Sequence, residues 1–159
     1  MSKPAAKNPT VKMTGYQTSV LRCAVAGVLL LAGIAWLVVY TQLAMDHAEF
    51  AHKLLFDKPK NPLPWMSDLY KWNYAIGFGA IFLALIVAAH PKTPLGRGQG
   101  VVVGMLGCFL IGLVWIVTYY FVGQESSVHI PVMDKLNQLN LIVGVSFMAV
   151  GFTFATKWE

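Results

Sequence analysis

The chain has 159 residues, of which 57% are hydrophobic and 12% are charged, and its formal net charge is +5. Soluble domains carry about twice as many charged residues, roughly a quarter of the total. The apolar residues are gathered into four uncharged runs, which argues against a soluble globular protein. The composition predicts an all-α integral membrane protein with four transmembrane helices.

Residues 1–19 form a polar leader that holds two prolines and three lysines before the first apolar run. The segment has no apolar periodicity, so it is predicted to be a cytoplasmic tail without a packed core. Two interpretations stay open for this tail. It is attracted to anionic lipid or an acidic partner, or it is only a topology signal.

The first apolar run covers residues 23–43 and contains no charged residue. At about 1.5 Å per helical residue it is long enough to cross the roughly 30 Å hydrocarbon core of a bilayer. A cleaved signal peptide has only about 7–15 apolar residues, so this run is predicted to stay as a membrane anchor. We expect its helix to continue outward through residues 46–52.

The following loop, residues 45–70, is the longest, and its prolines at positions 59, 62 and 64 predict an extended second half. It is too short for a catalytic domain. Metal chemistry is considered because polar residues cluster there: Asp46, His47, Glu49, His52 and Asp57. However, His47 and His52 are five residues apart, whereas zinc-binding histidines on one helix face are usually about four apart. We therefore predict a solvated loop, with no metal and no cofactor.

Three further runs cover residues 73–89, 101–122 and 139–155. The middle one is as long as the first run. The other two lie near the lower limit of about 17 residues for a spanning helix, so we expect their helices to begin earlier, near Leu69 and Leu136. Residues 90–100 are rich in proline and glycine and predict a short inner turn.

Basic residues give the orientation. With the N-terminus inside, seven lie on the cytoplasmic side and five outside. The inner residues are Lys3, Lys7, Lys12, Arg22, Lys92, Arg97 and Lys157, and the outer ones are Lys53, Lys58, Lys60, Lys71 and Lys135. The excess inside predicts a multi-pass protein of the cell membrane with both termini in the cytoplasm.

The sequence also repeats itself at two constant spacings. Three residues recur 79 positions later (112 − 33): Gly33, Trp36 and Tyr40 match Gly112, Trp115 and Tyr119. Five more recur 67 positions later (144 − 77): Pro64, Met66, Leu69, Asn73 and Gly77 match Pro131, Met133, Leu136, Asn140 and Gly144. An internal repeat fixes the architecture. It predicts two helical hairpins, residues 20–92 and 99–159.

Small residues recur at helical spacing in the spans, and such stripes let helix backbones approach closely, while an asparagine at the edge can hydrogen-bond across. Packing within each hairpin is the simpler interpretation, and recognition of other transmembrane helices is the alternative. Trp36 and Trp115 lie away from the membrane interface that tryptophan prefers, so each is expected to contact a helix. The residues predicted for helix packing or partner contact are Gly33, Trp36, Tyr40, Trp72, Asn73, Gly77, Gly112, Trp115, Tyr119, Asn140, Gly144 and Gly151.

None of the four runs contains Asp, Glu, Lys, Arg or His. Ion-coupled transporters generally need an ionisable group within the membrane. The spans hold one serine, Ser146, without a histidine or lysine at its depth, so no enzyme is predicted. A small four-span transporter or channel stays open on size and duplication alone, with Gln42, Asn73, Thr118 and Asn140 as its polar candidates.

Several segments of the second half closely resemble the CrgA family of actinobacterial cell-division membrane proteins. They are FLIGLVWIVTYY (109–120), Pro131, NLIVG (140–144) and GFTFATKW (151–158). GIAWLVVY (33–40) and WNYAI (72–76) resemble a more divergent copy. Family members are single two-span hairpins, so the resemblance implies a tandem duplication. The tail here lacks the family's dense Lys/Arg cluster, so contacts made by a basic tail are not carried over.

The resemblance implies a non-enzymatic protein of the divisome. Such a protein regulates or scaffolds septum formation and coordinates it with septal peptidoglycan synthesis. The implied partners are divisome proteins such as FtsZ and the membrane-anchored septal transpeptidase, and the implied location is the division septum. Pairing with a second copy stays open, and no nucleic-acid partner is expected.

Overall fold

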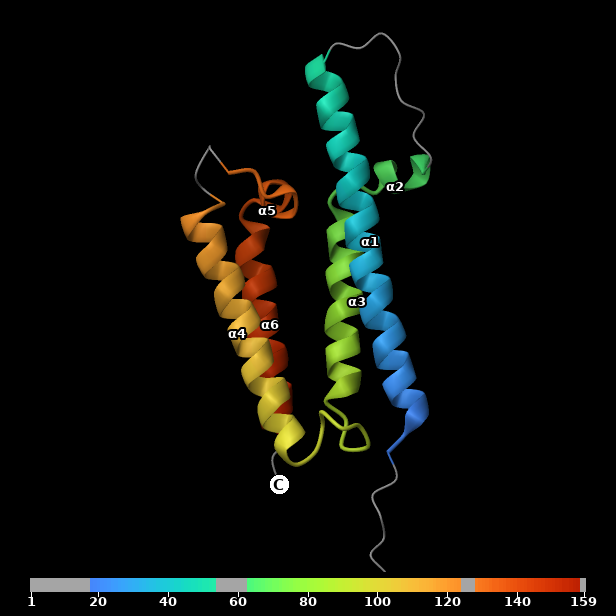
Figure 1. The fold of residues 1–159 in the computed structure, drawn as a ribbon, viewed down its shortest axis with the longest axis vertical. Coiled ribbons are helices and arrows are strands. Elements are labelled where there is room, and N and C mark those ends of the chain that lie inside the picture. The colour runs from blue at the N-terminus through green and yellow to red at the C-terminus, as the bar shows by residue number, and fades with distance from the viewer. Residues whose placement is uncertain (1–17, 54–62, 124–127, 158–159) are drawn as a thin grey trace, which may run out of the picture.

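The computed structural model describes residues 18–53, 63–123 and 128–157, and within these ranges the chain is helical and has no strand. The helices are α1 (Val20–Lys53), α2 (Pro64–Asp68), α3 (Trp72–Ala88), α4 (Gln99–Phe121), α5 (Pro131–Leu136) and α6 (Leu139–Ala155). Figure 1 shows two antiparallel pairs, α1 with α3 and α4 with α6, standing side by side. The prediction of an all-α fold is confirmed.

In each pair the first helix is the longer one, α1 in the first pair and α4 in the second. In α1 the stretch Val20–Leu43, and α4 over its whole length, are long and apolar enough to cross a bilayer, whereas α3 and α6 are shorter apolar helices of 17 residues each. The predicted outward extension of the first helix through residues 46–52 is confirmed, because α1 continues to Lys53.

The predicted early starts of the second and fourth long helices are wrong. α3 begins at Trp72 and α6 at Leu139, and neither reaches back to Leu69 or Leu136. The reason is a backbone break at equivalent positions, where Tyr70 and Asn137 have φ values of 43° and 50°. Right-handed helix cannot pass through a left-handed residue, so each long helix is preceded by a separate short one.

The predicted loop, residues 45–70, does not stay extended up to the break at Tyr70. Pro64 begins helix α2, which is compatible with proline because its missing N–H is not needed in the first helical turn. The prolines at positions 59 and 62 lie outside the described residues. The two short helices α2 and α5 therefore occupy the same end of the molecule, beside the starts of α3 and α6 (Figure 1).

The inner link between the two pairs is a series of turns, as predicted. Thr93 is 2% exposed, and its hydroxyl donates to the carbonyl oxygen of His90 at 2.6 Å. The backbone N–H of Ser19 donates to the carbonyl oxygen of Lys92 at 3.0 Å, which ties the start of α1 to the link. Gly98, with a φ of 52°, allows the sharp entry into α4.

Each helix pair is held together at a pair of glycines. A Cβ atom placed on Gly33 would lie 2.8 Å from the carbonyl oxygen of Gly77. A Cβ atom placed on Gly112 would lie 2.5 Å from the carbonyl oxygen of Gly144. Both distances are below 3.0 Å, which is closer than a real Cβ atom comes to a backbone oxygen. Only glycine therefore permits the helices to come this close.

The packing around the glycines also follows the repeat. The side chain of Leu37 lies over Gly77, and the side chain of Ile116 lies over Gly144. Leu37 and Ile116 are themselves separated by the repeat spacing of 79 (116 − 37). The two sequence copies therefore fold into two hairpins with the same helix contact.

The two hairpins meet mainly through α3 and α6, and Trp115 of α4 also reaches α3, while α1 and α4 lie on the outside (Figure 1). The ring centroids of Phe82 and Phe147 lie 4.9 Å apart and those of Phe78 and Trp115 lie 5.6 Å apart, and both pairs meet edge to face. Aromatic pairs of this geometry are each stabilising by about 0.5–1.5 kcal/mol beyond their burial. We call these four rings the aromatic seam.

Replacing Gly112 with alanine is expected to destabilise the protein by about 1–3 kcal/mol, because the new methyl group overlaps the Gly144 carbonyl and forces α4 from α6. The matched control is Gly107→Ala on the same helix, where a Cβ atom meets nothing within 4 Å. This control is expected to be neutral or slightly stabilising, because alanine favours helix by up to about 1 kcal/mol. Thermal unfolding of the purified variants measures the difference, and equal midpoints would contradict the close contact.

Candidate functional site

A buried asparagine holds the break before each of the helices α3 and α6. The side-chain amide Nδ2 of Asn73 donates to the carbonyl oxygens of Met66 at 2.7 Å and Tyr70 at 3.0 Å. Met66 lies in the last turn of α2, where helix carbonyls lack partners further along the helix, and the Tyr70 carbonyl also accepts from the backbone N–H of Asn73 at 3.2 Å. An asparagine amide has two N–H donors, which is the number required.

The second copy repeats this arrangement. Asn140 Nδ2 donates to the carbonyl oxygens of Met133 and Asn137, both at 2.7 Å. Both asparagines are 0% exposed. The sequence pattern suggested hydrogen bonds from these side chains across to another helix, and in the structure their amides bond to the short helix just before, α2 or α5, and to the turn that follows it. The sequence did hold a signal for these bonds. Met66 and Met133 recur at the same spacing as the asparagines, and they supply the carbonyl oxygens that the asparagine amides bond.

Besides the hydroxyl of Tyr74, four buried polar atoms stay unpaired within the part of the chain that the structure describes. They occur at equivalent places in the two copies and are Trp36 Nε1, Trp115 Nε1, Asn73 Oδ1 and Asn140 Oδ1. Buried polar atoms nearly always have a hydrogen-bond partner. Each hairpin therefore retains one buried donor and one buried acceptor whose partners are not supplied by these residues.

The two tryptophans make different contacts although they occupy the same repeat position. The ring of Trp36 lies 5.5 Å from that of Trp65 on α2, within its own hairpin. Trp115 instead contacts Phe78 of the other hairpin and joins the aromatic seam. The helix contact expected for Trp36 is thus made with the short helix α2, and that of Trp115 with α3.

Four predicted residues remain, and they differ in how far they pack against other helices of the chain. Tyr40 packs edge to face on Tyr74 of α3 at 5.0 Å, whereas Tyr119 lies against its neighbour Tyr120. Gly151 faces Phe109 of α4, where an added Cβ atom would lie 3.2 Å from the ring. Trp72 is 72% exposed at the start of α3, so it is not packed within the chain.

A broad apolar surface covers the outer sides of α1 and α4, where large aliphatic side chains are exposed. We call it the outer band, and it includes Val28, Leu31, Val38, Val103, Leu106, Leu110 and Val114. Exposure of apolar side chains on this scale marks contact with a membrane or with another protein.

Charged residues lie at the two ends of the molecule. Arg22, Lys92, Arg97 and Lys157 lie at the end that carries the inner link, and Arg22 contacts the ring of His90. Loss of hydration and the positive charges of Arg22, Lys92 and Lys157 lower the pKa of His90 below its usual value. The opposite end, with α2 and α5, carries both signs, and His129 Nδ1 lies 3.3 Å from Asp134 there.

Within the described ranges, no three His, Cys, Asp or Glu residues come together as a metal site would require. The side chains of Asp46, His47, Glu49 and His52, and residue Asp57, lie outside the described part of the chain, as do residues 1–17 of the predicted tail.

These features define a protein built from two tandem copies of one apolar helical hairpin. The chain matches the family described as "Cell division protein CrgA" in two segments, residues 1–92 and 93–159, and it belongs to this family. The resemblance drawn from the sequence is confirmed, and the two matched segments agree with a tandem duplication.

Two relatives carry the same name. The chain is similar to the cell division protein CrgA of Streptomyces avermitilis, with 42% identity over 65 residues, 41% of this chain and 71% of that protein. It is also similar to that of Corynebacterium glutamicum, with 27% identity over 86 residues, 54% of this chain and 78% of that protein. No solved structure matches the chain significantly.

Replacing Asn140 with leucine is expected to destabilise the protein by about 1–3 kcal/mol, because the carbonyls of Met133 and Asn137 lose the bonds from its amide and keep only their backbone donors. The matched control is Gln138→Leu, which makes the same kind of change two residues earlier at an exposed side chain. Thermal unfolding of the two variants is the measurement. If both variants unfold at the wild-type temperature, Asn140 does not hold the turn.

Proposed function

We propose that this chain is a multi-pass membrane protein of the divisome that acts without catalysis. In this role it regulates or scaffolds septum formation and coordinates it with septal peptidoglycan synthesis. The observation that carries the proposal is the membership of both hairpins in a family described as cell division proteins, together with the outward-facing outer band.

Membrane insertion is supported by where the apolar surface lies. Only 6% of the most apolar stretch of α1 and 22% of that of α4 is buried within the chain. The core helix of a soluble protein is mostly buried, so these exposed faces need a different apolar environment. At about 25 cal/mol per Å² of apolar surface, a hydrocarbon environment favours such helices strongly over water.

The proposed topology places the inner link in the cytoplasm. Both described chain ends, near Thr18 and Lys157, emerge at the end that carries this link (Figure 1). The basic residues Arg22, Lys92 and Arg97 lie at the same end, in agreement with the excess of positive charge on the cytoplasmic side. The short helices α2 and α5 then lie outside, with their acidic residues.

A partner-binding role is supported by the distribution of polar groups. The long helices carry no ionisable residue within the predicted spans, and the contact between α3 and α6 is aromatic and aliphatic. The amides of Asn73 and Asn140 are engaged by backbone carbonyls and do not line a path between the hairpins. These observations favour a scaffold over a transporter, and the outer band and Trp72 are the proposed contact surfaces.

The proposed partners are divisome proteins, including FtsZ on the cytoplasmic side and the membrane-anchored septal transpeptidase. A membrane-anchored partner reaches the outer band directly, whereas a cytoplasmic partner reaches only the tail and the inner link. Location at the division septum follows from the same proposal.

The topology predicts which positions a membrane-impermeant thiol reagent can reach. In a chain with Cys23 and Cys108 replaced by serine, His129→Cys is expected to react in intact cells, because His129 is exposed beside α5. Thr156→Cys is expected to react only after the membrane is permeabilised. Reaction of Thr156→Cys in intact cells would contradict the proposed orientation.

Photo-crosslinking in dividing cells tests the proposed partners. A photoreactive residue at Val28 or Leu110 of the outer band is expected to capture divisome or septal cell-wall proteins, identified by mass spectrometry. The matched control is Phe154, which is 1% exposed and is expected to give adducts only within the chain. The scaffold role is contradicted if the two exposed positions yield no such protein while the labelled chains are stable.

A further inference from the structure

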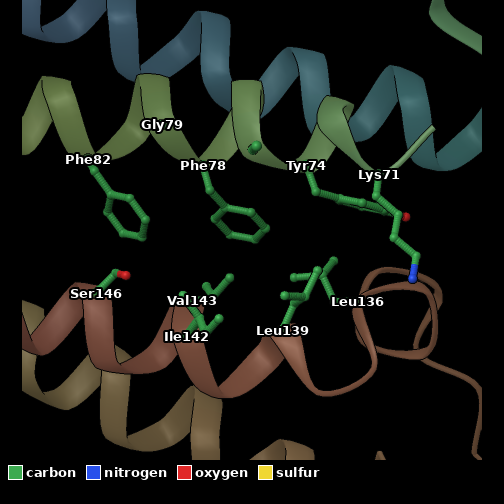
Figure 2. A pocket seen from close by; sticks show the side chains of 11 residues that line it. Lys71, Tyr74, Phe78, Gly79, Phe82, Leu136, Leu139, Ile142, Val143 and Ser146 are labelled. Carbon is green, nitrogen blue, oxygen red and sulfur yellow. The ribbon is translucent and has the colours of Figure 1, made fainter. Parts of the chain in front are cut away.

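An apolar groove with a volume of about 230 Å³ lies between the two hairpins (Figure 2). One wall is formed by α3 through Tyr74, Phe78 and Phe82, and the facing wall by α6 through Leu139 and Val143. The groove extends from the α2 and α5 end of the molecule toward the aromatic seam. It is the gap that the limited contact between α3 and α6 leaves open.

The groove has a positive charge at its outer mouth. Lys71 precedes α3, and Figure 2 shows its side chain extending from α3 toward α5 across the end of the groove. Lys71 is exposed and forms no ion pair within the described part of the chain. Ser146 adds one hydroxyl on the α6 wall, and apart from Lys71 and Tyr74 the other lining residues have only apolar side chains or, at Gly79, none.

We propose that the groove holds an acyl chain of an anionic phospholipid, with the lipid phosphate bound by the ammonium group of Lys71. This inference rests on the proposed membrane insertion. In that orientation Lys71 lies at the level of the outer headgroups, where a phosphate is available. The walls below it provide the apolar surface that an acyl chain needs.

The size of the groove decides against other occupants. A partner helix has a diameter of about 10–12 Å with its side chains, which this volume cannot accommodate. A free phosphate would bind Lys71 but would leave the apolar walls without contacts. A single acyl chain is narrow enough to enter, and its phosphate completes the charge pair.

Binding at this place links the two hairpins. One wall belongs to residues of the first copy and the other to residues of the second, so one lipid contacts both. The bound lipid therefore adds to the aromatic seam and stabilises the association of α3 with α6.

Gly79 on the α3 wall allows the groove to be filled without a backbone clash, because an added Cβ atom meets nothing within 4 Å. Gly79→Leu is expected to place its side chain in the groove and exclude the lipid. Gly107→Leu is the matched control, since Gly107 has the same open space and does not line the groove. Ser146→Leu fills the groove from the opposite wall.

The measurement is native mass spectrometry of the full chain released from vesicles of phosphatidylglycerol and phosphatidylcholine. The wild-type chain and Gly107→Leu are expected to retain one phosphatidylglycerol. Gly79→Leu and Ser146→Leu are expected to lose at least about tenfold of this occupancy, and Lys71→Gln to lose the preference for the anionic lipid by about tenfold.

Unchanged retention by both groove-filling variants, or equal retention of the two lipids by the wild type, would overturn the inference. Extraction of the same membranes at alkaline pH separates this failure from that of the proposed function. A chain that resists extraction but retains no lipid contradicts only the lipid site. A chain that is extracted contradicts membrane insertion, and the lipid site with it.

Discussion

The close approach of two helix backbones at a glycine pair is the contact on which the rest of the structure depends. Gly33 on Gly77 and Gly112 on Gly144 leave no room for a Cβ atom, so each hairpin has one fixed contact point and register. This register places the side chain of Leu37 over Gly77 and that of Ile116 over Gly144. In a bilayer, where apolar side chains gain little by leaving lipid for protein, such backbone packing is a main source of helix association. The repeat preserves these residues because their size cannot vary.

The two hairpins have the same fold but carry different side chains on the faces where they meet, and the interface between them depends on this difference. Phe78 and Phe82 of the aromatic seam correspond, at the repeat spacing of 67, to Val145 and Ala149 of the second copy, both of which are exposed. The seam therefore joins two different faces, aromatic on α3 and mixed on α6. A tandem chain can specialise the two copies in this way, whereas two identical hairpins present the same face to each other. The groove at Lys71 follows from the same asymmetry.

The sequence predicts those parts of the structure that depend on residue size and local periodicity. The repeat, the helical class, the outward extension of α1 and the family resemblance all follow from it. The breaks before α3 and α6 were missed because Tyr70, unlike glycine, carries no sign of a left-handed backbone, and Asn137 carries only a weak one. The contacts of Trp36 and Trp115 could not be predicted either. Equivalent residues in a repeat have different neighbours once the copies pack side by side, and that arrangement is set by α3 and α6 together.

The association of the two hairpins into one unit, through α3 and α6, is the feature of the structure most open to test. Its most direct test is to produce residues 1–92 and 93–159 as separate chains in the same cells, with an affinity tag on one of them, and to measure how much of the other co-purifies. The halves are expected to co-purify from detergent, and Phe82→Ala, which removes a ring of the seam, is expected to reduce the yield sharply. If both halves insert stably in the membrane and neither retains the other, the hairpins are independent, which contradicts this association.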